Sequence, residues 1–214
     1  MTTKVIGLGA GGHAKVVIEA LLSKHEYHLV GLLDPNETLY GQKILNIPVI
    51  GSDEQLPALI QQGITKSFVG VGSVGNADLR RRLFMLGKAH RLEPLTIIHP
   101  QAVVSPSAHL GEGTVVFAGA VINAEARIGE NVIINTGAIV EHDCMIGDHA
   151  HIATGARLAG AVTVGAGAHI GAGATVRQRI KIGENAVVGA GAVVVKNVVD
   201  GITVIGIPAK PLSK

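Results

Sequence analysis

Five ionisable side chains lie close together near the middle of the chain: Glu141, His142 and Asp143 in succession, then His149 and His151. A carboxylate beside a histidine can orient the ring and raise its basicity, and a basic imidazole can take a proton from an attacking amine or hydroxyl. Such a base would serve acyl transfer, in which backbone N–H groups stabilise a tetrahedral oxyanion. No serine or cysteine is positioned as an alternative nucleophile, so the pattern favours direct attack on a thioester.

A second group of candidate residues lies near the N-terminus, in the run G-A-G-G-H that ends at His13. Residues 4–8 are predicted as a short buried strand, and residues 14–22 as an amphipathic helix. A glycine-rich turn between strand and helix exposes free N–H groups at the helix N-terminus to a phosphate. Gly7, Gly9 and Gly12 also match the G-x-G-x-x-G pattern of nucleotide-binding loops.

Two further predicted strands lead to the same edge of the sheet. Residues 28–33 form a strand followed by Asp34, where an acidic side chain would meet a ribose or a base edge. Residues 67–72 and 76–90 are predicted as a third strand and its helix. Because ligands of open α/β sheets bind at the carboxyl ends of the strands, we expect a binding rim made of Gly11, Gly12, His13, Asp34 and Gly72. The alternative is a βαβ unit whose glycines only make tight turns.

The length of this region limits what it can bind. Only three clear strands and two helices fit before about residue 95, which corresponds to one mononucleotide-binding half rather than the two halves that a dinucleotide uses. Pro94 and Pro100 bracket a connector to the remainder. We therefore predict a Rossmann-like α/β domain over residues 1–95 and a second domain over residues 96–214.

The second domain is built on a short repeat. From Ile98 to Val194 an aliphatic residue recurs at every sixth position, a small residue usually follows four positions later, and glycine often comes directly after the aliphatic one. A fixed short period is typical of a solenoid, whose repeats bury their apolar sides by stacking. Three hexads make one coil, so the stretch corresponds to about five coils of a triangular β-helix. The pattern resembles the left-handed parallel β-helix of the hexapeptide-repeat acyltransferases.

The composition agrees with a narrow solenoid. Hydrophobic residues make up 47% of the chain, yet aromatic residues make up only 2% and tryptophan is absent. Aromatic side chains supply much of the volume of an ordinary globular core, whereas a thin prism needs aliphatic residues inside and small residues at its corners. Residues 158–176 carry no formal charge, but they hold five glycines and keep the hexad phase. We therefore reject a membrane span there.

The net charge restricts the possible binding partners, and the single cysteine restricts the cellular compartment. The formal net charge is +2, and no Lys/Arg run is dense enough for a nucleic-acid patch, so we expect no nucleic-acid partner. Arg80–Arg82 is interpreted as a solvated helix face. Cys144 occupies a small position of the repeat and is predicted to be a packed thiol. One cysteine allows no internal disulfide, and together with the absence of a signal peptide this favours the cytoplasm.

The histidines of the repeats never occupy the aliphatic or the small position, so they do not belong to the core of the hexads. Most off-core histidines are simply solvated, and a metal is the rival use of the clustered ones. The γ-class carbonic anhydrases share the left-handed helix and bind zinc between subunits through a distant histidine and a pair five residues apart. No two histidines of residues 96–214 have that spacing. We therefore expect no metal.

Four motifs together point to one family: G-A-G-G-H at residues 9–13, I-H-P-Q-A-V-V-S-P-S-A at 98–108, N-T-G-A-I-V-E-H-D-C at 135–144 and G-I-P-A-K at 206–210. With them the chain resembles the NeuD/PglD family of sugar acetyltransferases over its full length. The resemblance implies a homotrimer that uses acetyl-CoA to acetylate the amine of a nucleotide-linked amino-dideoxy sugar, of the UDP-4-amino-4,6-dideoxy type. It also leaves O-acetylation of sialic acid or another sugar as the alternative.

The resemblance also implies roles for residues of the repeats. His142 would be the general base, and Asp143, where the family often has glutamate, the acidic neighbour that tunes it. His151 would lie along the acetyl-CoA channel and hydrogen-bond the thioester end. The pantetheine arm would run between subunits along the backbone of Gly160, Ala172 and Ala190.

For the first domain the resemblance implies a nucleotide-sugar site. Gly11, Gly12 and His13 would hold the phosphates, and Asp34 would contact the base or ribose. Gly72 matches the glycine that ends the third strand. Residues 1–95 would thus bind the nucleotide sugar, and residues 96–214 would form the acetyltransferase domain with a C-terminal tail.

Overall fold

An alternation of strands and helices builds the first part of the chain in the computed structural model, which describes residues 2–23 and 26–212. The strands are β1 (Thr3–Leu8), β2 (Tyr27–Leu33), β3 (Lys43–Ile44), β4 (Ile47–Gly51), β5 (Lys66–Val69) and β6 (Glu93–Pro94). They form one sheet in the order β3-β4-β2-β1-β5-β6, parallel except for the β3–β4 hairpin. The helices are α1 (Gly12–Leu22), α2 (Leu56–Gln61) and α3 (Asp78–Ala89), with two 3-10 turns, η1 (Glu37–Leu39) and η2 (Asp53–Gln55).

This sheet confirms the predicted strands β1, β2 and β5 and the helices α1 and α3, but the prediction of only three strands and two helices is wrong. The additional β3–β4 hairpin extends the sheet beside β2, and α2 follows it. These elements lack a readable period because they are short and contain prolines, Pro48 in β4 and Pro57 in the first turn of α2. Leu45 and Asn46, both with positive φ, make the hairpin turn.

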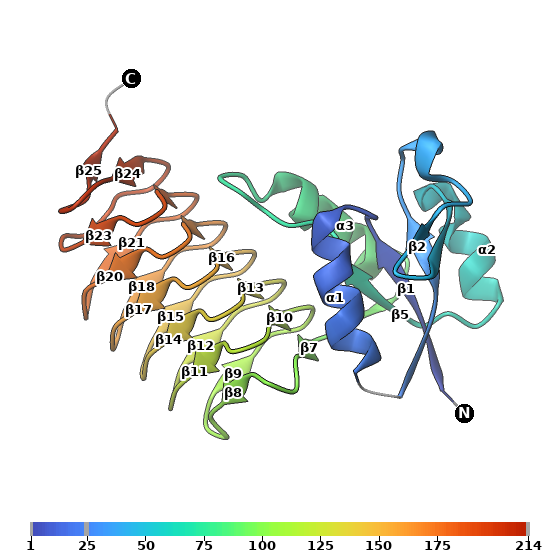
Figure 1. The fold of residues 1–214 in the computed structure, drawn as a ribbon, viewed down its shortest axis with the longest axis horizontal. Helices are drawn as coiled ribbons and strands as arrows, with labels where there is room; N and C mark the ends of the chain where they lie inside the picture. Colours follow the sequence, from blue (N-terminus) through green and yellow to red (C-terminus); the bar gives the residue numbers. More distant parts are fainter. Residues whose placement is uncertain (1, 24–25, 213–214) are drawn as a thin grey trace.

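The remainder forms a left-handed parallel β-helix of two-residue strands, stacked from the α/β unit toward the C-terminus (Figure 1). The first face consists of β7 (Ile97–Ile98), β10 (Val115–Val116), β13 (Ile133–Ile134), β16 (His151–Ile152), β19 (His169–Ile170) and β22 (Val187–Val188). The second face consists of β8 (Val103–Val104), β11 (Val121–Ile122), β14 (Ile139–Val140), β17 (Arg157–Leu158), β20 (Thr175–Val176) and β23 (Val193–Val194). The third face consists of β9 (His109–Leu110), β12 (Arg127–Ile128), β15 (Met145–Ile146), β18 (Thr163–Val164) and β21 (Lys181–Ile182).

Each strand pairs in parallel with the strand one coil later, as in Ile133 with His151 and Ile134 with Ile152. The second residue of each strand is the aliphatic residue of the hexad and points inward together with the small residue four positions later. Val140 and Cys144, for example, are both fully buried. Cys144 is therefore a packed thiol, as predicted, and burial raises its pKa to about 11. A short hairpin-like end, β24 (Thr203–Ile205) and β25 (Lys210–Pro211), extends the first face.

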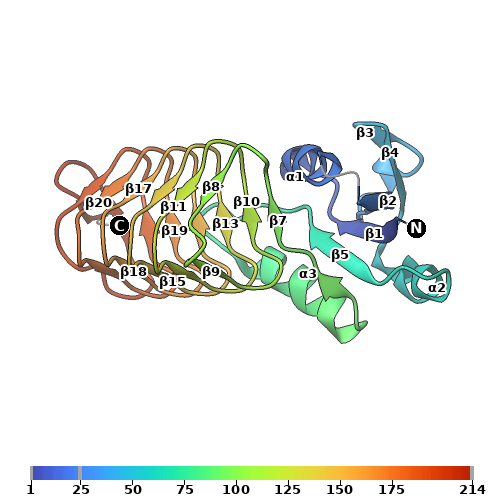
Figure 2. The same ribbon diagram turned by 90° about the horizontal axis from the view of Figure 1, so that it is seen from below.

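The α/β unit packs against the beginning of the first face (Figure 2). The outward residues Ile97, Val115 and Ile133 are buried there, in one apolar cluster with residues of β1 and α1 such as Val17 and Leu21. The next outward residues along this face are His151 and His169, which are also buried. The two parts of the chain therefore share a continuous core, and the histidines lie where that core ends.

Arg80 of α3 corrects the prediction that Arg80–Arg82 is a solvated face. Its side chain is fully buried and carries no carboxylate partner among the described residues. The guanidinium donates from Nη1 to the carbonyls of Val69 (3.2 Å) and Val71 (2.8 Å), and from Nε to the carbonyl of Asn131 (3.1 Å). Burial lowers the pKa of Arg80 to about 9. Arg80 thus joins the end of β5 to a corner of the β-helix.

None of the helices in the described part of the chain is both long and apolar enough to cross a membrane.

We predict that Arg80→Met lowers the free energy of unfolding by about 2–4 kcal/mol, because three buried carbonyls lose a donor. Arg82→Met, which changes an exposed arginine of the same helix, is the matched control and should change it by less than about 0.5 kcal/mol. Urea titrations monitored by circular dichroism measure the free energy of unfolding of both variants. Equal stability of the two variants would contradict the assigned role of Arg80.

Candidate functional site

His142 and Asp143 form a pair at a corner of the β-helix between the second and third faces. The chain turns there at Asp143, whose φ is +59°, and His142 Nδ1 lies 2.7 Å from Asp143 Oδ2. Because an ionised carboxylate can only accept, Nδ1 carries the proton and Nε2 presents a lone pair. The ring is 62% exposed. The pair therefore has the tautomer and the access that a general base needs.

Gly160 lies one coil beyond His142 at the same corner. A Cβ atom at Gly160 would be 2.7 Å from both Cε1 and Nε2 of the His142 ring. The missing side chain therefore makes room for the ring, and it leaves the backbone of residue 160 beside the free nitrogen. Its carbonyl accepts the Arg179 N–H at 3.0 Å, which holds this backbone in the stack of coils.

The glycine-rich loop connects β1 to α1, and Asp34 holds it in place. Asp34 accepts hydrogen bonds from the backbone N–H groups of Ala10 (2.9 Å) and Asn36 (3.0 Å). Gly11 and Gly12 are exposed, with open space where a Cβ atom would stand. Within the described residues no side chain caps the start of α1. Because the Ala14 N–H donates to the carbonyl of Gly11 (3.1 Å), the first-turn N–H groups left for an anion are those of Gly12 and His13.

His13 and Gly72 lie together at the rim of the α/β sheet. A Cβ atom at Gly72 would lie 3.6 Å from the His13 ring, and that ring packs edge-on against Phe117 of the β-helix, with centroids 5.4 Å apart. Burial, followed by the charges of Arg80 and His151, lowers the pKa of His13 to about 3. The imidazole is therefore neutral. Its Nε2 is buried and has no partner among the described residues.

A cavity of about 450 Å³ opens beside the first face, next to the Gly72 loop. Its wall includes Asn135, His151, Thr154, His169, Ala172 and Ala190. The Nδ1 of His151 hydrogen-bonds the carbonyl of Ser73, its Nε2 lies 3.1 Å from the Asn135 Nδ2 atom, and its ring packs against His169 at 4.9 Å. Burial lowers the pKa of His151 to about 4, so this imidazole is neutral as well.

The structure thus gathers the predicted residues into two groups on one chain. Gly11, Gly12, His13, Asp34 and Gly72 lie around one rim, which adjoins the cavity of His151, Ala172 and Ala190 through Ser73. His142, Asp143 and Gly160 lie at a different corner, across the second face. Gly160 contacts His142 and lies across the second face from Ala172 and Ala190.

Sequence reasoning missed Ser73 and Asn135. Ser73 follows Gly72 in a loop without a pattern of its own. Asn135 follows the aliphatic Ile134, and the 18-residue stacking that puts Ile133 beside His151 could have predicted its proximity to that ring. Among residues 2–23 and 26–212, no group of three His, Cys, Asp or Glu side chains could hold a metal ion.

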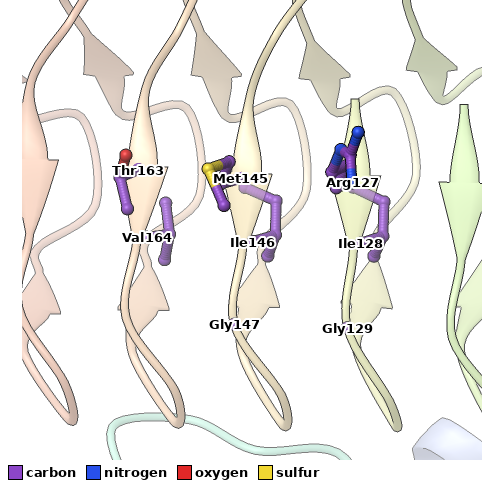
Figure 3. Close-up of a pocket in the computed structure, with 8 residues that line it drawn as sticks. All are labelled: Arg127, Ile128, Gly129, Met145, Ile146, Gly147, Thr163 and Val164. Carbon is purple, nitrogen blue, oxygen red and sulfur yellow. The ribbon is translucent and has the colours of Figure 1, made fainter. Parts of the chain in front are cut away.

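The third face carries a shallow hollow of about 300 Å³, shown in Figure 3, between β12, β15 and β18. Arg127, Met145 and Thr163 project from these strands around it, and Arg127 is the only titratable side chain in its lining. None of the predicted site residues lies there. We therefore do not assign it to the candidate site.

The buried His151 should make the stability of the protein depend on pH. Its pKa is about 4 when folded and about 6.5 when unfolded, so the unfolded chain binds more protons between these values. The contribution of this residue is complete above pH 6.5 and is lost as the pH falls toward 4. Between pH 7 and pH 5 we predict that His151→Gln loses about 2 kcal/mol less stability than the original chain. The control is His109→Gln, a change of an exposed histidine, and it should lose as much stability between the two pH values as the original chain. Urea titrations at pH 7 and pH 5 measure the free energy of unfolding of each variant.

Two family models match the chain. The PglD N-terminal domain matches residues 4–86, and the bacterial transferase hexapeptide (six repeats) matches residues 125–160 and 161–196. A curated relative, UDP-N-acetylbacillosamine N-acetyltransferase from Bacillus subtilis (strain 168), is 42% identical over 109 residues, which are 50% of this chain and 48% of the relative. The matched region thus spans about half the length of that relative.

Solved structures match along the whole chain. A variant of perosamine N-acetyltransferase from Caulobacter crescentus, in complex with CoA and GDP-perosamine, is 42% identical with a TM-score of 0.93, covering 100% of this chain and 99% of that one. The acetyltransferase domain of PglB from Neisseria gonorrhoeae FA1090, in complex with acetyl coenzyme A, is 39% identical with a TM-score of 0.90, covering 99% and 100%. With the α/β unit, the hexapeptide coils and these full-length matches, the chain belongs to the NeuD/PglD family of hexapeptide-repeat sugar acetyltransferases.

Proposed function

We propose that this chain is an acetyl-CoA-dependent N-acetyltransferase that acts on the amine of a nucleotide-linked amino-dideoxy sugar in the cytoplasm. The observation that carries the proposal is the His142–Asp143 pair, whose 2.7 Å contact occupies Nδ1 and leaves the Nε2 of an exposed side chain to accept a proton. Two relatives support the proposal: one is named UDP-N-acetylbacillosamine N-acetyltransferase, and another was solved with CoA and GDP-perosamine.

The reaction is direct transfer without an acyl-enzyme. The sugar amine attacks the thioester carbonyl carbon, and His142 Nε2 takes the proton that the nitrogen loses. Asp143 holds the proton on Nδ1 and stabilises the imidazolium that forms. As the C–S bond breaks, the proton passes to the leaving thiolate of CoA. Cys144 takes no part, because its thiol is buried and protonated.

The acceptor binds to the rim of the α/β unit, so we assign residues 1–95 to the nucleotide sugar and residues 96–214 to the acetyl transfer. The open N–H groups at Gly11 and Gly12 suit its phosphates. His13 is neutral and can donate a hydrogen bond to a phosphate oxygen without adding charge. Asp34, half-buried beside the loop, faces the ribose or base, and Gly72 keeps the rim open.

The acyl donor binds in the cavity of the first face. Its pantetheine arm passes Ala172 and Ala190, which lie on successive coils and offer only small side chains. His151 lines the same cavity at the end nearest the Gly72 loop, and Gly160 contributes backbone beside His142. The complexes of two relatives with CoA or acetyl coenzyme A support this donor.

The active form is a homotrimer. The outward residues of the second face are mostly apolar, Val103, Val121, Ile139 and Val193, and each is at least partly exposed. This face separates the His142 corner from the corner that carries Ala172 and Ala190. A threefold axis along it would bury the aliphatic stripe and bring His142 of one subunit to the cavity of the next. The two halves of the site, separated in one chain, would then meet.

We expect His142→Ala to lower kcat about 10²- to 10⁴-fold with acetyl-CoA and a GDP- or UDP-linked 4-amino-4,6-dideoxy sugar. His13→Ala should raise the KM for the sugar at least tenfold while the KM for acetyl-CoA changes less than twofold. Release of CoA, followed with a thiol-reactive dye, gives both values. His109→Ala, an exposed histidine of the third face, is the control. Efficient turnover of a sugar hydroxyl without a nucleotide, unaffected by His13→Ala, would contradict the proposed acceptor.

The trimer has its own test. Ile139→Asp places a charge in the middle of the second face, and we predict monomers that keep the β-sheet circular dichroism but lose acetyl transfer. Met145→Asp puts the same charge on the exposed third face and should leave both the assembly and the activity intact. Sedimentation velocity measures the mass of the assembly that each variant forms. A trimeric, active Ile139→Asp variant would show that the second face is not the interface.

A further inference from the structure

Residues 71–73 follow β5 and contact three side chains of the junction in turn. The first carbonyl of this stretch accepts a hydrogen bond from Nη1 of Arg80 at 2.8 Å. A Cβ atom on the glycine in the middle would lie 3.6 Å from Nδ1 of His13, which is an ordinary contact distance. The third carbonyl accepts a hydrogen bond from Nδ1 of His151. Arg80, His13 and His151 therefore lie around one short stretch of backbone.

The two ring nitrogens of His13 have different surroundings. Nδ1 faces Gly72 at the rim of the α/β sheet. It is also the ring nitrogen nearer the backbone of His13, whose N–H group is left for an anion at the start of α1. Nε2 lies deeper, buried and without a hydrogen-bond partner among the described residues. Nδ1 is therefore the nitrogen that a ligand at the rim meets.

The position of one proton decides whether His13 attracts or repels a phosphate. A phosphate oxygen only accepts hydrogen bonds, so the ring binds it when Nδ1 carries the proton. The ring is neutral at pH 7, because burial lowers its pKa to about 3, and a neutral imidazole carries a single N–H. With the proton on Nε2, Nδ1 would direct a lone pair at the phosphate, and the buried N–H would have no acceptor.

A buried positive charge acts on this ring from the interior of the junction. Arg80 is fully buried, and no carboxylate pairs with it in the part of the chain that the structure describes. Its charge is the second cause, after burial, of the lowered pKa of His13. Nε2 is the ring nitrogen that shares the interior with this charge. At low dielectric constant a nearby cation favours a lone pair over an N–H group.

The remaining hydrogen-bond donors of the junction act in the same direction. Arg80 uses Nη1 and Nε for three backbone carbonyls, and its Nη2 is buried without a partner among the described residues. A guanidinium nitrogen can only donate, so Nη2 complements a lone pair on Nε2 of His13 and not an N–H. Burial lowers the pKa of Arg80 only to about 9, so the cation persists at pH 7.

We propose that Arg80 is a positioning residue for the phosphates of the nucleotide sugar and acts through His13. Its buried guanidinium keeps the ring proton off Nε2 and on Nδ1, and the Nδ1–H group donates to a phosphate oxygen. Arg80 itself touches neither the substrate nor the reacting atoms. The proposal rests on the proposed function, and it gives Arg80 a second task besides joining β5 to the β-helix.

The first test determines the tautomer of His13 in the full chain at pH 7. Two-bond ¹H–¹⁵N correlation spectra of protein labelled with ¹⁵N-histidine distinguish a ring protonated on Nδ1 from one protonated on Nε2. The signal that disappears in His13→Asn belongs to His13. His151 is the internal reference, because its Nδ1 must carry a proton to donate to a carbonyl. We expect the Nδ1–H tautomer for both rings, and a His13 ring protonated on Nε2 would overturn the proposal.

Two amide variants of His13 locate the donor that the phosphates use. His13→Asn places an amide N–H group near the position of Nδ1, and it should keep the Kd for GDP or UDP within about threefold of the original. His13→Gln places the amide near the position of Nε2 and should raise this Kd about tenfold, since a charge-assisted hydrogen bond is lost. Isothermal titration calorimetry measures both values. Tighter binding by His13→Gln than by His13→Asn would contradict the assignment of the donor to Nδ1.

A double-mutant cycle separates positioning by Arg80 from its structural role. An amide has no tautomer to fix, so Arg80→Met should raise the Kd for the nucleotide about fivefold or more in the original chain but less than twofold in the His13→Asn background. All titrations are made at a temperature at which circular dichroism shows the variants folded. The same rise in both backgrounds would reduce Arg80 to a structural residue. If Arg80→Met does not fold, the tautomer of His13 in the original chain decides the question.

The same measurements distinguish a failure of this proposal from a failure of the proposed function. An original chain that binds neither GDP nor UDP, and that transfers no acetyl group to a nucleotide-linked amino sugar, would overturn the proposed function. Tight nucleotide binding by a chain whose His13 is protonated on Nε2 would leave the proposed function intact and overturn only the role of Arg80.

Discussion

The narrow interior of the β-helix is the constraint on which the rest of the structure depends. Each face of each coil offers space for one aliphatic side chain and one small one, as Val140 and Cys144 illustrate. Backbone hydrogen bonds link every coil to the next and allow no slippage of the register. Apart from Thr114, whose buried hydroxyl donates to the carbonyl of Gly129 (2.8 Å), polar and charged side chains are thereby excluded from the interior. They are confined to the outward strand position and to the corners, and the candidate site uses both.

Whether an outward histidine is reactive depends on what covers it. His142 stands at an open corner with Asp143, where its lone pair is accessible. His13 and His151 lie under the junction of the two parts of the chain, where burial lowers the pKa of each far below neutrality. The same residue type therefore offers an accessible ring nitrogen in one place and neutral hydrogen-bonding groups in the other.

The junction also contains buried polar groups within its shared core. The buried Arg80 donates to three carbonyls and has no carboxylate partner in the described part of the chain, and the carbonyl of Ser73 accepts a hydrogen bond from the ring of His151. The loop after β5 is therefore attached to the β-helix at two points, Asn131 and His151. The rim that receives the acceptor in our proposal and the cavity that receives the donor thus belong to one contact region between the two parts of the chain.

Much of the fold could be read from the sequence because it depends on local repetition. The six-residue period determined the β-helix, its three faces and the packed state of Cys144. The G-A-G-G-H run determined the loop between β1 and α1. Family motifs pointed to His142 and Asp143, which are neighbours in the chain and need no tertiary contact to meet.

Only the tertiary structure decided how separate segments share a site. Nothing in the charge of Arg80–Arg82 reveals that the first arginine is buried, because burial depends on which face of α3 meets the β-helix. The tautomer of His151 depends on Ser73 and Asn135, which are 78 and 16 residues away from it. The separation of Gly160 from Ala172 and Ala190 depends on the corner each one occupies. A local pattern records residue type and period, whereas hydrogen-bond partners between distant segments exist only after the chain has folded.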